Sequence, residues 1–425
     1  MRGSSRGIAF RILLVSLAFW APAAGGAELP TAVPEDVGMS SKRLLRINDS
    51  MNRHIEAGDI QGGVTAVARR GKVVHFEAHG LMDVGAGKPM KKDAIFIMMS
   101  STKPVLGVSA MMMVEEGLIR TNDAVSDFIP EFKDMNVAVL KEPTDEDVSP
   151  TMVDSTKGIP EHRLVPAKRE VTIHDLLTHT SGIMSGGLGT AVGGGQQMTE
   201  RDTLANYIPT VGQAPLDFQP GTRWAYSGAG LDAVARIIEI VSGKPYDEFV
   251  RERVFEPLGM EDTYYNLPLE KDGRRVVISD VDMASYRQPT TYFSGSYGLS
   301  STAGDYLRFE QMLVRGGELF GNRLLGPRTV DMMASNQVGD LFRGALGGQL
   351  DGLGEGFGYT VAVVLDAFAT PEHRRSAGAF GWGGAFGTLH WTDPKEELTG
   401  VILLQQAHLQ TLADFENAVR QAIID

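Results

Sequence analysis

An almost unbroken run of apolar residues spans positions 105–114, shortly after Ser100 and Lys103. In a helix this run is apolar on every side, and such a helix lies inside a domain rather than on its surface. Residues three positions apart share one face of a helix, so Lys103 is expected to lie over Ser100. The chain is therefore expected to fold around a buried helix that begins with a serine and a lysine.

A buried serine and lysine one helical turn apart have the chemistry of a nucleophile and its base. Burial disfavours the ammonium form of lysine, which lowers its pKa and yields an amine that accepts a proton. A serine hydroxyl is a weak nucleophile until such a neighbour removes its proton. The alternative interpretation is structural: Ser100 caps the helix and Lys103 extends to solvent. Because S-x-x-K patterns often arise by chance, the choice depends on other motifs.

The composition is that of a soluble globular enzyme. Of the 425 residues, 43% are hydrophobic and 22% are charged, and this length suggests two or three domains, or two lobes around one core. The absence of cysteine excludes disulfides, a lipid-modified N-terminal cysteine and a thiol nucleophile. The formal charge of −13 argues against nucleic acid as a partner. No phosphate-binding glycine motif is present, and we predict no cofactor.

The first 27 residues have the pattern of an export signal. Arg2, Arg6 and Arg11 give a basic start, residues 12–21 are apolar, and residues 23–27 are small, as in a cleavage region. The apolar stretch is too short to span a bilayer as a stable helix, and no second candidate follows. We therefore expect a periplasmic or secreted bacterial protein with no stable membrane span after cleavage. An uncleaved signal anchor is the alternative.

Periodicity divides the rest of the chain into strands near both ends and helices between them. We predict one helix from Ser40 or Ser41 to Gly58, a second that begins at residues 173–177, a third over residues 231–242 and a terminal helix capped by Thr411. The predicted strands are 63–69, 72–79, 357–366, 384–392 and 398–405. This order predicts an α+β fold in which both termini complete one sheet covered by helices. We place the sheet lobe at 28–95 and 296–425 and an inserted, mainly helical lobe at 96–295.

Two short aromatic segments accompany the serine–lysine pair. The first is a turn that places Tyr226 at the start of a helix. A tyrosine in such a place is most often a packing residue. The second opens a strand, and its glycines let another backbone approach closely. Their central residues are Tyr226-Ser227-Gly228 and Trp382-Gly383-Gly384-Ala385.

In this order, the three motifs resemble those of the serine β-lactamase and penicillin-binding protein superfamily. The likeness is greatest to the class C-like branch called family VIII carboxylesterases, which pairs S-x-x-K with a Y-S-x segment and a W-G-G strand. The resemblance covers residues 30–425 and implies a β-lactamase-like antiparallel sheet. Further landmarks are Pro34-Glu35-Asp36-Val37-Gly38-Met39, Leu176-Leu177-Thr178-His179-Thr180-Ser181-Gly182, Phe255-Glu256-Pro257-Leu258-Gly259-Met260, Gly298-Leu299 and Asp305-Tyr306.

The resemblance implies a role for each motif residue. Ser100 would attack the acyl carbon, and Lys103 and Tyr226 would share the task of general base, with a cationic Lys103 favouring the Tyr226 phenolate. The backbone amides of Ser100 and Ala385 would form the oxyanion hole. The remaining implied substrate-binding residues are Trp382, Gly383, Gly384, Ser227 and Gly228.

Two departures from the lactamase pattern favour esters over β-lactams. The lactamase relatives carry an asparagine two residues after the tyrosine, where this chain has Gly228, and a lysine or histidine where it has Trp382. Those polar groups help to bind the amide and carboxylate of a β-lactam. Nearby cations that could partly replace them are His373, Arg374 and Arg375.

The expected function is an exported serine carboxylesterase that acts on short-chain esters. The alternatives are hydrolysis of cephalosporin-type β-lactams as a main or side activity, and a penicillin-binding protein or D-amino-acid peptidase that acylates slowly. An acyl transferase, a stalled acyl-enzyme and a pseudoenzyme are also considered. The absence of a G-x-S-x-G elbow argues against an α/β-hydrolase. His174 and His179 are poorly spaced for a metal, so we predict no metal site, and His179 is expected to be structural.

Overall fold

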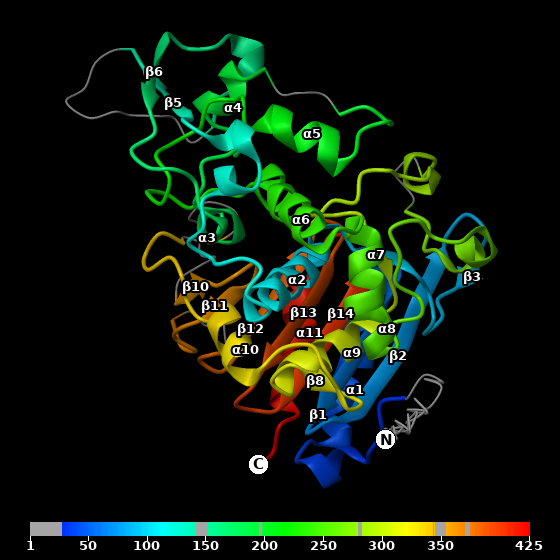
Figure 1. Ribbon diagram of the computed structural model, residues 1–425. Coiled ribbons are helices and arrows are strands. Elements are labelled where there is room, and N and C mark those ends of the chain that lie inside the picture. The colour runs from blue at the N-terminus through cyan, green and yellow to red at the C-terminus, as the bar shows by residue number, and fades with distance from the viewer. Residues whose placement is uncertain are drawn as a thin grey trace, which may run out of the picture.

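The centre of the fold is an antiparallel sheet that contains strands from both ends of the chain (Figure 1). The computed structural model describes residues 28–141, 152–194, 198–278, 283–342, 344, 354–369 and 375–425; the predicted export signal, His373 and Arg374 lie outside them. In the described part, eight strands follow the order β10-β11-β12-β13-β14-β1-β2-β3. Their bounds are β1 Gly62–Arg69, β2 Lys72–Asp83, β3 Lys88–Pro89, β10 Glu355–Phe357, β11 Ala362–Val364, β12 Phe380–Gly384, β13 Thr388–Asp393 and β14 Leu398–Leu404.

The pairing of β1 with β14 confirms that the two termini complete one sheet. Val64 lies opposite Leu403 across this pair, and the predicted hairpin around Arg70 and Gly71 joins β1 to β2. Successive side chains of a strand point to opposite faces. Helices cover both faces, which confirms the predicted fold class.

The C-terminal strands differ in detail from the prediction. Residues 357–366 form two strands, because Thr360 adopts a φ of +69° in the turn where the Gly358 amide donates to the Val361 carbonyl. Residues 380–384 form a strand of their own, β12, although they contain three glycines. Ala385 lies in the turn that follows β12, not on the strand.

Two helices at the ends of the chain pack on one face of the sheet, and two central helices pack on the other. Helices α1 and α11 share an apolar cluster with Val67 and Ile402, whereas α2 and α9 share one with Ala66 and Val401. The helix bounds are α1 Ser41–Ala57, α2 Lys103–Glu115, α3 Ile173–Leu177, α4 Leu188–Val192, α5 Leu204–Val211, α6 Gly228–Ser242, α7 Tyr246–Val250, α8 Glu256–Leu258, α9 Ala303–Val314, α10 Pro327–Met333 and α11 Leu409–Gln421.

The helical part contains α3 to α6 and lies beyond one end of the sheet in Figure 1. The described part also contains three separate strand pairs: β4 Phe96–Ile97 with β7 Ser300–Ser301, β5 Asn136–Leu140 with β6 His162–Pro166, and β8 Glu318–Leu319 with β9 Asn322–Arg323. None of the helices in the described part of the chain combines the length and apolar composition needed to cross a membrane.

The predicted ends of the first helix are confirmed, whereas the predicted start of the last helix is not. Ser40 caps α1 through its side chain, and Gly58 ends that helix with a φ of +80°, as predicted. The predicted cap of the terminal helix is wrong: α11 begins after His408, and Thr411 lies in its first turn. His408 occupies the cap position, and its Nδ1 is bonded to the Thr411 hydroxyl at 2.8 Å.

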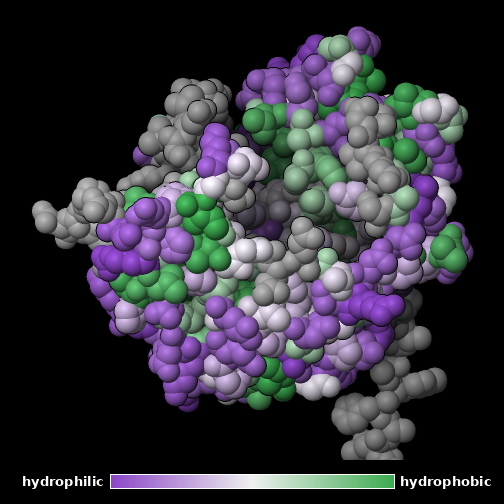
Figure 2. Space-filling view, turned by 90° about the horizontal axis from the view of Figure 1, so that it is seen from above, coloured by the Kyte–Doolittle hydropathy of each residue, from purple (hydrophilic) through white to green (hydrophobic). Residues whose placement is uncertain are grey.

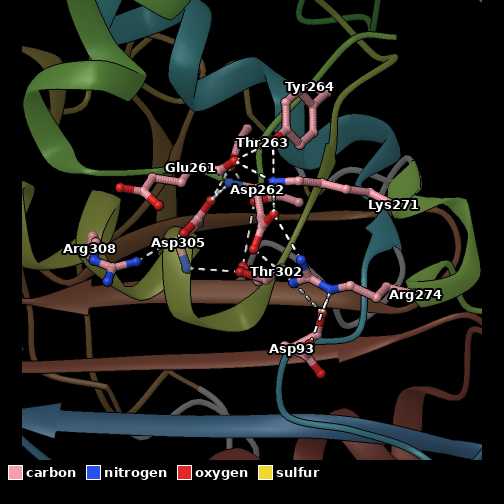
Figure 3. Close-up of polar contacts among 11 residues, drawn as sticks. Asp93, Glu261, Asp262, Thr263, Tyr264, Lys271, Arg274, Thr302, Asp305 and Arg308 are labelled. Carbon is pink, nitrogen blue, oxygen red and sulfur yellow. Dashed lines mark hydrogen bonds and ion pairs between the residues drawn. The ribbon is translucent and has the colours of Figure 1, made fainter. Parts of the chain in front are cut away.

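A charged network holds the loop after α8 against the start of α9 (Figure 3). The Asp262 carboxylate accepts hydrogen bonds from Lys271 and Arg274, and Arg274 also donates to the Asp93 carbonyl ahead of β4. The Asp305 carboxylate accepts from the Asp262 amide at 2.7 Å and from the Thr263 hydroxyl at 3.0 Å. The network thus supports β4, which leads directly to Ser100.

Candidate active site

A tight turn presents Ser100 in front of α2. Ser100 lies in the 3₁₀ turn Met99–Thr102, and Met99 before it has a φ of +48°, a conformation that costs a residue with a side chain on the order of 1 kcal/mol. The turn is held on two sides: the Met98 amide donates to the Leu299 carbonyl, and Tyr306 donates to the Ser101 carbonyl. Tyr306 belongs to the Asp305-Tyr306 landmark, which therefore positions this turn.

Lys103 is buried in direct contact with Ser100. Lys103 is the first residue of α2 and is 2% exposed. The helix is buried on every side, as the apolar run predicts. Its Nζ donates to Ser100 Oγ at 2.9 Å and to the Ser296 carbonyl at 2.7 Å. Burial lowers the pKa of Lys103 to about 7, while the negative charge of Asp232 acts in the opposite direction. A neutral amine is therefore available near neutral pH.

Tyr226 completes the group, on the segment that leads into α6. Lys103 Nζ lies 4.6 Å from the centroid of its ring. Burial raises the pKa of Tyr226, and a hydrogen bond with Ser100 offsets part of that rise. The expected phenolate is thus disfavoured: Tyr226 keeps its proton at neutral pH, because burial of the phenol outweighs its hydrogen bonds with Ser100 and Trp382.

Aromatic rings fix the orientation of Tyr226. Its ring packs on His179 at 4.6 Å and stacks on Trp382 at 5.9 Å between centroids. Burial lowers the pKa of His179 far below its usual value, so this imidazole is neutral, and its Nδ1 accepts the Ser227 amide at 3.1 Å. His179 therefore has the structural surroundings expected for it.

The two residues after the tyrosine have different surroundings. Ser227 is 2% exposed, and its Oγ accepts the Gly230 amide at 3.0 Å as the cap of α6. Its side chain is thus occupied by helix capping rather than facing the cavity. Gly228 lines the cavity, and a Cβ at this position would lie 3.1 Å from Ser296 Oγ.

A buried carboxylate beneath Lys103 was not found by sequence reasoning. Asp232 accepts hydrogen bonds from Tyr292 at 2.9 Å, from Ser294 Oγ at 2.6 Å and from the Ser296 amide at 3.2 Å. It thereby holds the backbone whose carbonyl accepts from Lys103. The available signal was an aspartate directly after Leu231, inside the apolar stripe of α6.

Strand β12 passes directly beside the Ser100 turn. A Cβ at Gly384 would lie 2.3 Å from the Met98 carbonyl oxygen and 2.4 Å from Thr388 Oγ1, so only glycine fits there. A Cβ at Gly383 would lie 2.8 Å from the Thr388 carbonyl. The close approach predicted for the W-G-G segment is therefore present at Gly384, next to Met98. Trp382, Gly383, Gly384 and Ala385 are not among the residues that line the cavity described below.

A cavity of about 310 Å³ opens over Ser100, Lys103 and Tyr226. Its lining residues are Met99, Ser100, Lys103, Met198, Tyr207, Tyr226, Gly228, Ala229, Asp232, Ser296 and Tyr297. From above, the molecular surface is hollowed near its centre, with apolar residues along one side of the hollow (Figure 2).

Of the three cations that could compensate for Trp382, Arg375 is the one that lies within the described residues, and it is engaged elsewhere. Arg375 pairs with Glu416 of α11 at 2.5 Å and lies over the Trp391 ring at 4.8 Å. Its charge is thus committed to α11 and cannot serve a bound carboxylate at the same time, which corrects the expectation for this residue.

Comparisons with known proteins agree with this geometry. A model of the beta-lactamase family matches residues 47–423. Protein Rv1367c of Mycobacterium tuberculosis is 32% identical over 374 residues, covering 84% of this chain and 88% of the relative. Esterase EstB of Burkholderia gladioli is 29% identical over 430 residues, covering 93% and 97%. The solved structure of EstCE1, a hydrolase with promiscuous acyltransferase activity, has the same fold: its TM-score is 0.70 at 24% identity over 90% of this chain and 99% of that one.

These matches confirm the resemblance drawn from the three motifs, because they span most of the chain and of each relative. The chain belongs to the β-lactamase family and is a serine hydrolase of the superfamily that contains serine β-lactamases and penicillin-binding proteins.

Proposed function

We propose that the protein is a serine carboxylesterase that cleaves short-chain esters through an acyl-enzyme on Ser100. The observation that carries the proposal is the 2.9 Å contact between Lys103 Nζ and Ser100 Oγ, in a site where burial lowers the pKa of the amine to about 7. A relative named an esterase aligns with 93% of the chain, which supports ester chemistry.

The proposed acylation step assigns different tasks to the two proton-carrying groups. Ser100 Oγ attacks the acyl carbon, and the neutral amine of Lys103 removes the hydroxyl proton. Tyr226, whose pKa is raised, donates its phenol proton to the departing alkoxide and regains a proton from Lys103. The amides of Ser100 and Ala385 stabilise the tetrahedral oxyanion, where the loss of one donor costs about 3–4 kcal/mol.

Deacylation uses the same groups in reverse. Water enters the cavity, the neutral amine of Lys103 removes one of its protons, and the resulting hydroxide attacks the acyl carbon. Tyr226 donates its phenol proton to the departing Ser100 oxygen and regains a proton from Lys103, and the carboxylic acid is released. Water is the one co-reactant that these steps consume.

Cavity chemistry supports esters over β-lactams. Gly228 offers no side-chain amide and Trp382 no cation, while Met198, Tyr207 and Tyr297 give the wall a largely apolar surface. An apolar wall favours the acyl chain or the alcohol of an ester over a charged carboxylate.

A parallel rate panel tests the function. We expect steady turnover of p-nitrophenyl butyrate, with a kcat/KM at least about tenfold above those of nitrocefin and a D-Ala-D-Ala peptide. Faster turnover of nitrocefin would make the protein a β-lactamase. A burst without turnover would make it a stalled acyl-enzyme.

The rate of ester hydrolysis should rise with pH through about 7. Lys103 acts as a base only when it is neutral, and its lowered pKa means that it is protonated below about 7 and neutral above. Tyr226 and His179 do not titrate in this range, because their pKa values move upward and far downward, respectively. The measurement is kcat/KM for p-nitrophenyl butyrate from pH 5 to 9.

The variant Asp232→Asn identifies the titrating group. The Asp232 carboxylate raises the pKa of Lys103, so its neutralisation should move the midpoint of the pH profile to a lower pH. An unchanged midpoint would assign the titration to a group other than Lys103.

The variant Gly228→Asn should raise nitrocefin turnover relative to ester turnover by about tenfold. An asparagine at this position restores a side-chain amide beside the cavity, although its Cβ would contact Ser296 Oγ at 3.1 Å. The matched control is Gly228→Ala, which adds the same Cβ without the amide. Equal ratios for both variants would exclude Gly228 as the discriminating departure.

We also propose export to the periplasm or the medium, on the pattern of the first 27 residues alone. Fractionation of cells that express the full chain, followed by N-terminal sequencing, tests it.

A further inference from the structure

Two histidines and an aspartate meet where the first and last helices of the fold pack together. Nδ1 of His54 lies 2.7 Å from one carboxylate oxygen of Asp59, and Nε2 of His408 lies 3.9 Å from the other. One such atom from each of the three residues lies within 4.8 Å of the other two. This cluster is separate from the catalytic groups, since α1 and α11 cover one face of the sheet and α2 covers the other.

The local fold places each of these side chains for a clear reason. His54 lies on the buried face of α1, and Gly58 ends that helix in a left-handed conformation. The Asp59 amide then donates to the His54 carbonyl, which turns Asp59 back onto the helix end. His408 occupies the cap position of α11. The cluster is therefore built on helix ends rather than on free loops.

Both imidazoles have their second ring nitrogen occupied. Nε2 of His54 is bonded to the Asp414 carboxylate at 3.1 Å, and Nδ1 of His408 is bonded to the Thr411 hydroxyl at 2.8 Å. Metal-binding histidines usually have such partners, which fix the ring and its tautomer. The partners leave His54 Nδ1 and His408 Nε2 facing the Asp59 carboxylate, as two nitrogen ligands and one oxygen ligand would.

We propose that His54, Asp59 and His408 bind one Zn²⁺ ion, with water in the fourth position. Two imidazole nitrogens and a carboxylate form a zinc donor set, with bonds of about 2.0–2.2 Å. Zn²⁺ replaces the direct contact between His54 Nδ1 and the Asp59 carboxylate, and both atoms become ligands. The Asp59 and His408 side chains are 34% and 33% exposed, so they can close around the ion without disturbing the core. The charges of Asp59 and Asp414 together balance the ion.

A metal at this position joins the two ends of the chain. It should raise the thermal midpoint and leave ester turnover unchanged, because it binds the folded state on the sheet face away from Lys103. The proposal goes beyond the esterase function and does not depend on it.

Metal titration of the full chain tests the proposal. After EDTA treatment and dialysis, we expect one Zn²⁺ per chain by calorimetry with a Kd of about 1 µM or tighter, and Co²⁺ should give visible absorption typical of nitrogen and oxygen ligation. Zinc at a hundredfold excess over Kd should raise the thermal midpoint by several degrees. Binding weaker than about 100 µM would overturn the proposal and leave the cluster as ion pairs.

Variants locate the ion. His408→Ala and Asp59→Asn should each weaken zinc binding by about 30-fold or more and remove the thermal shift. The matched control is His162→Ala in β6, an imidazole bonded to the Pro160 carbonyl at 2.9 Å, which should bind zinc as the parent does. Binding equal to the parent in His408→Ala and Asp59→Asn, or lost in His162→Ala, would contradict the site. If His408→Ala does not fold, His408→Gln keeps the helix cap region filled and is measured instead.

Discussion

The variant Ser100→Ala should lose ester hydrolysis by about 10⁴-fold or more and should no longer be labelled by a fluorophosphonate. The Ser100 hydroxyl accepts a hydrogen bond from Lys103. Without this hydroxyl no acyl group can be bound covalently. The measurements are kcat/KM for p-nitrophenyl butyrate and the intact mass of the protein after labelling.

A serine within α2, the helix that follows Ser100, gives the control. Ser109 is buried and donates to the Val105 carbonyl at 2.8 Å, so Ser109→Ala removes a buried hydroxyl outside the site. This variant should be labelled as the parent is. Labelling that persists in Ser100→Ala would assign the nucleophile to another residue.

The variant Lys103→Met should lose about 10²–10⁴-fold in kcat/KM, because it removes the base while filling the same buried space. It should melt at the same temperature as the parent or higher at pH 7. Burial lowers the pKa of Lys103, which means that the folded state disfavours the ammonium form: the penalty is absent above the unfolded pKa of about 10.4 and grows as pH falls toward 7. Methionine carries no such penalty, and a melting curve measures the difference.

The variant Tyr226→Phe provides the comparison for Lys103→Met. Phenylalanine keeps the packing on His179 and Trp382 and removes only the phenol proton donor. A loss of activity with an unchanged melt supports the assigned transfer to the alkoxide. Near-parental rates in either variant would remove that residue from the proton-transfer scheme.

Much of the site follows from local sequence. The S-x-x-K spacing and the apolar run after it determine a buried helix start, so the contact between Ser100 and Lys103 needs little tertiary information. The hairpin at Arg70 and Gly71 and the caps of α1 are equally local, because turn and cap chemistry act over a few residues. Tyr226 and Trp382 could be associated with this pair only through the family resemblance, since nothing in their spacing brings them together.

The remaining features depend on packing between distant segments. The hydrogen bonds from Ser294 and Ser296 to Asp232 join positions more than 60 apart, and a charged residue within an apolar helix face was the sole local sign. His54 and His408 lie in the first and last helices, so a search for metal ligands by sequence spacing does not detect them. The W-G-G segment was expected to open one strand over 384–392, whereas residues 380–384 form β12 and a turn separates them from β13. Glycines favour loops in isolation, and the neighbouring strands on both sides impose the extended conformation.

The pairing of β1 with β14 affects how the polypeptide matures. Strand β14 lies between β13 and β1, so the edge of the N-terminal hairpin has no neighbour until the last tenth of the chain has been synthesised. The central sheet therefore closes late, after nearly the whole chain has left the ribosome. Removal of the carboxyl end back to β14 would take away a central strand together with α11, rather than a dispensable tail.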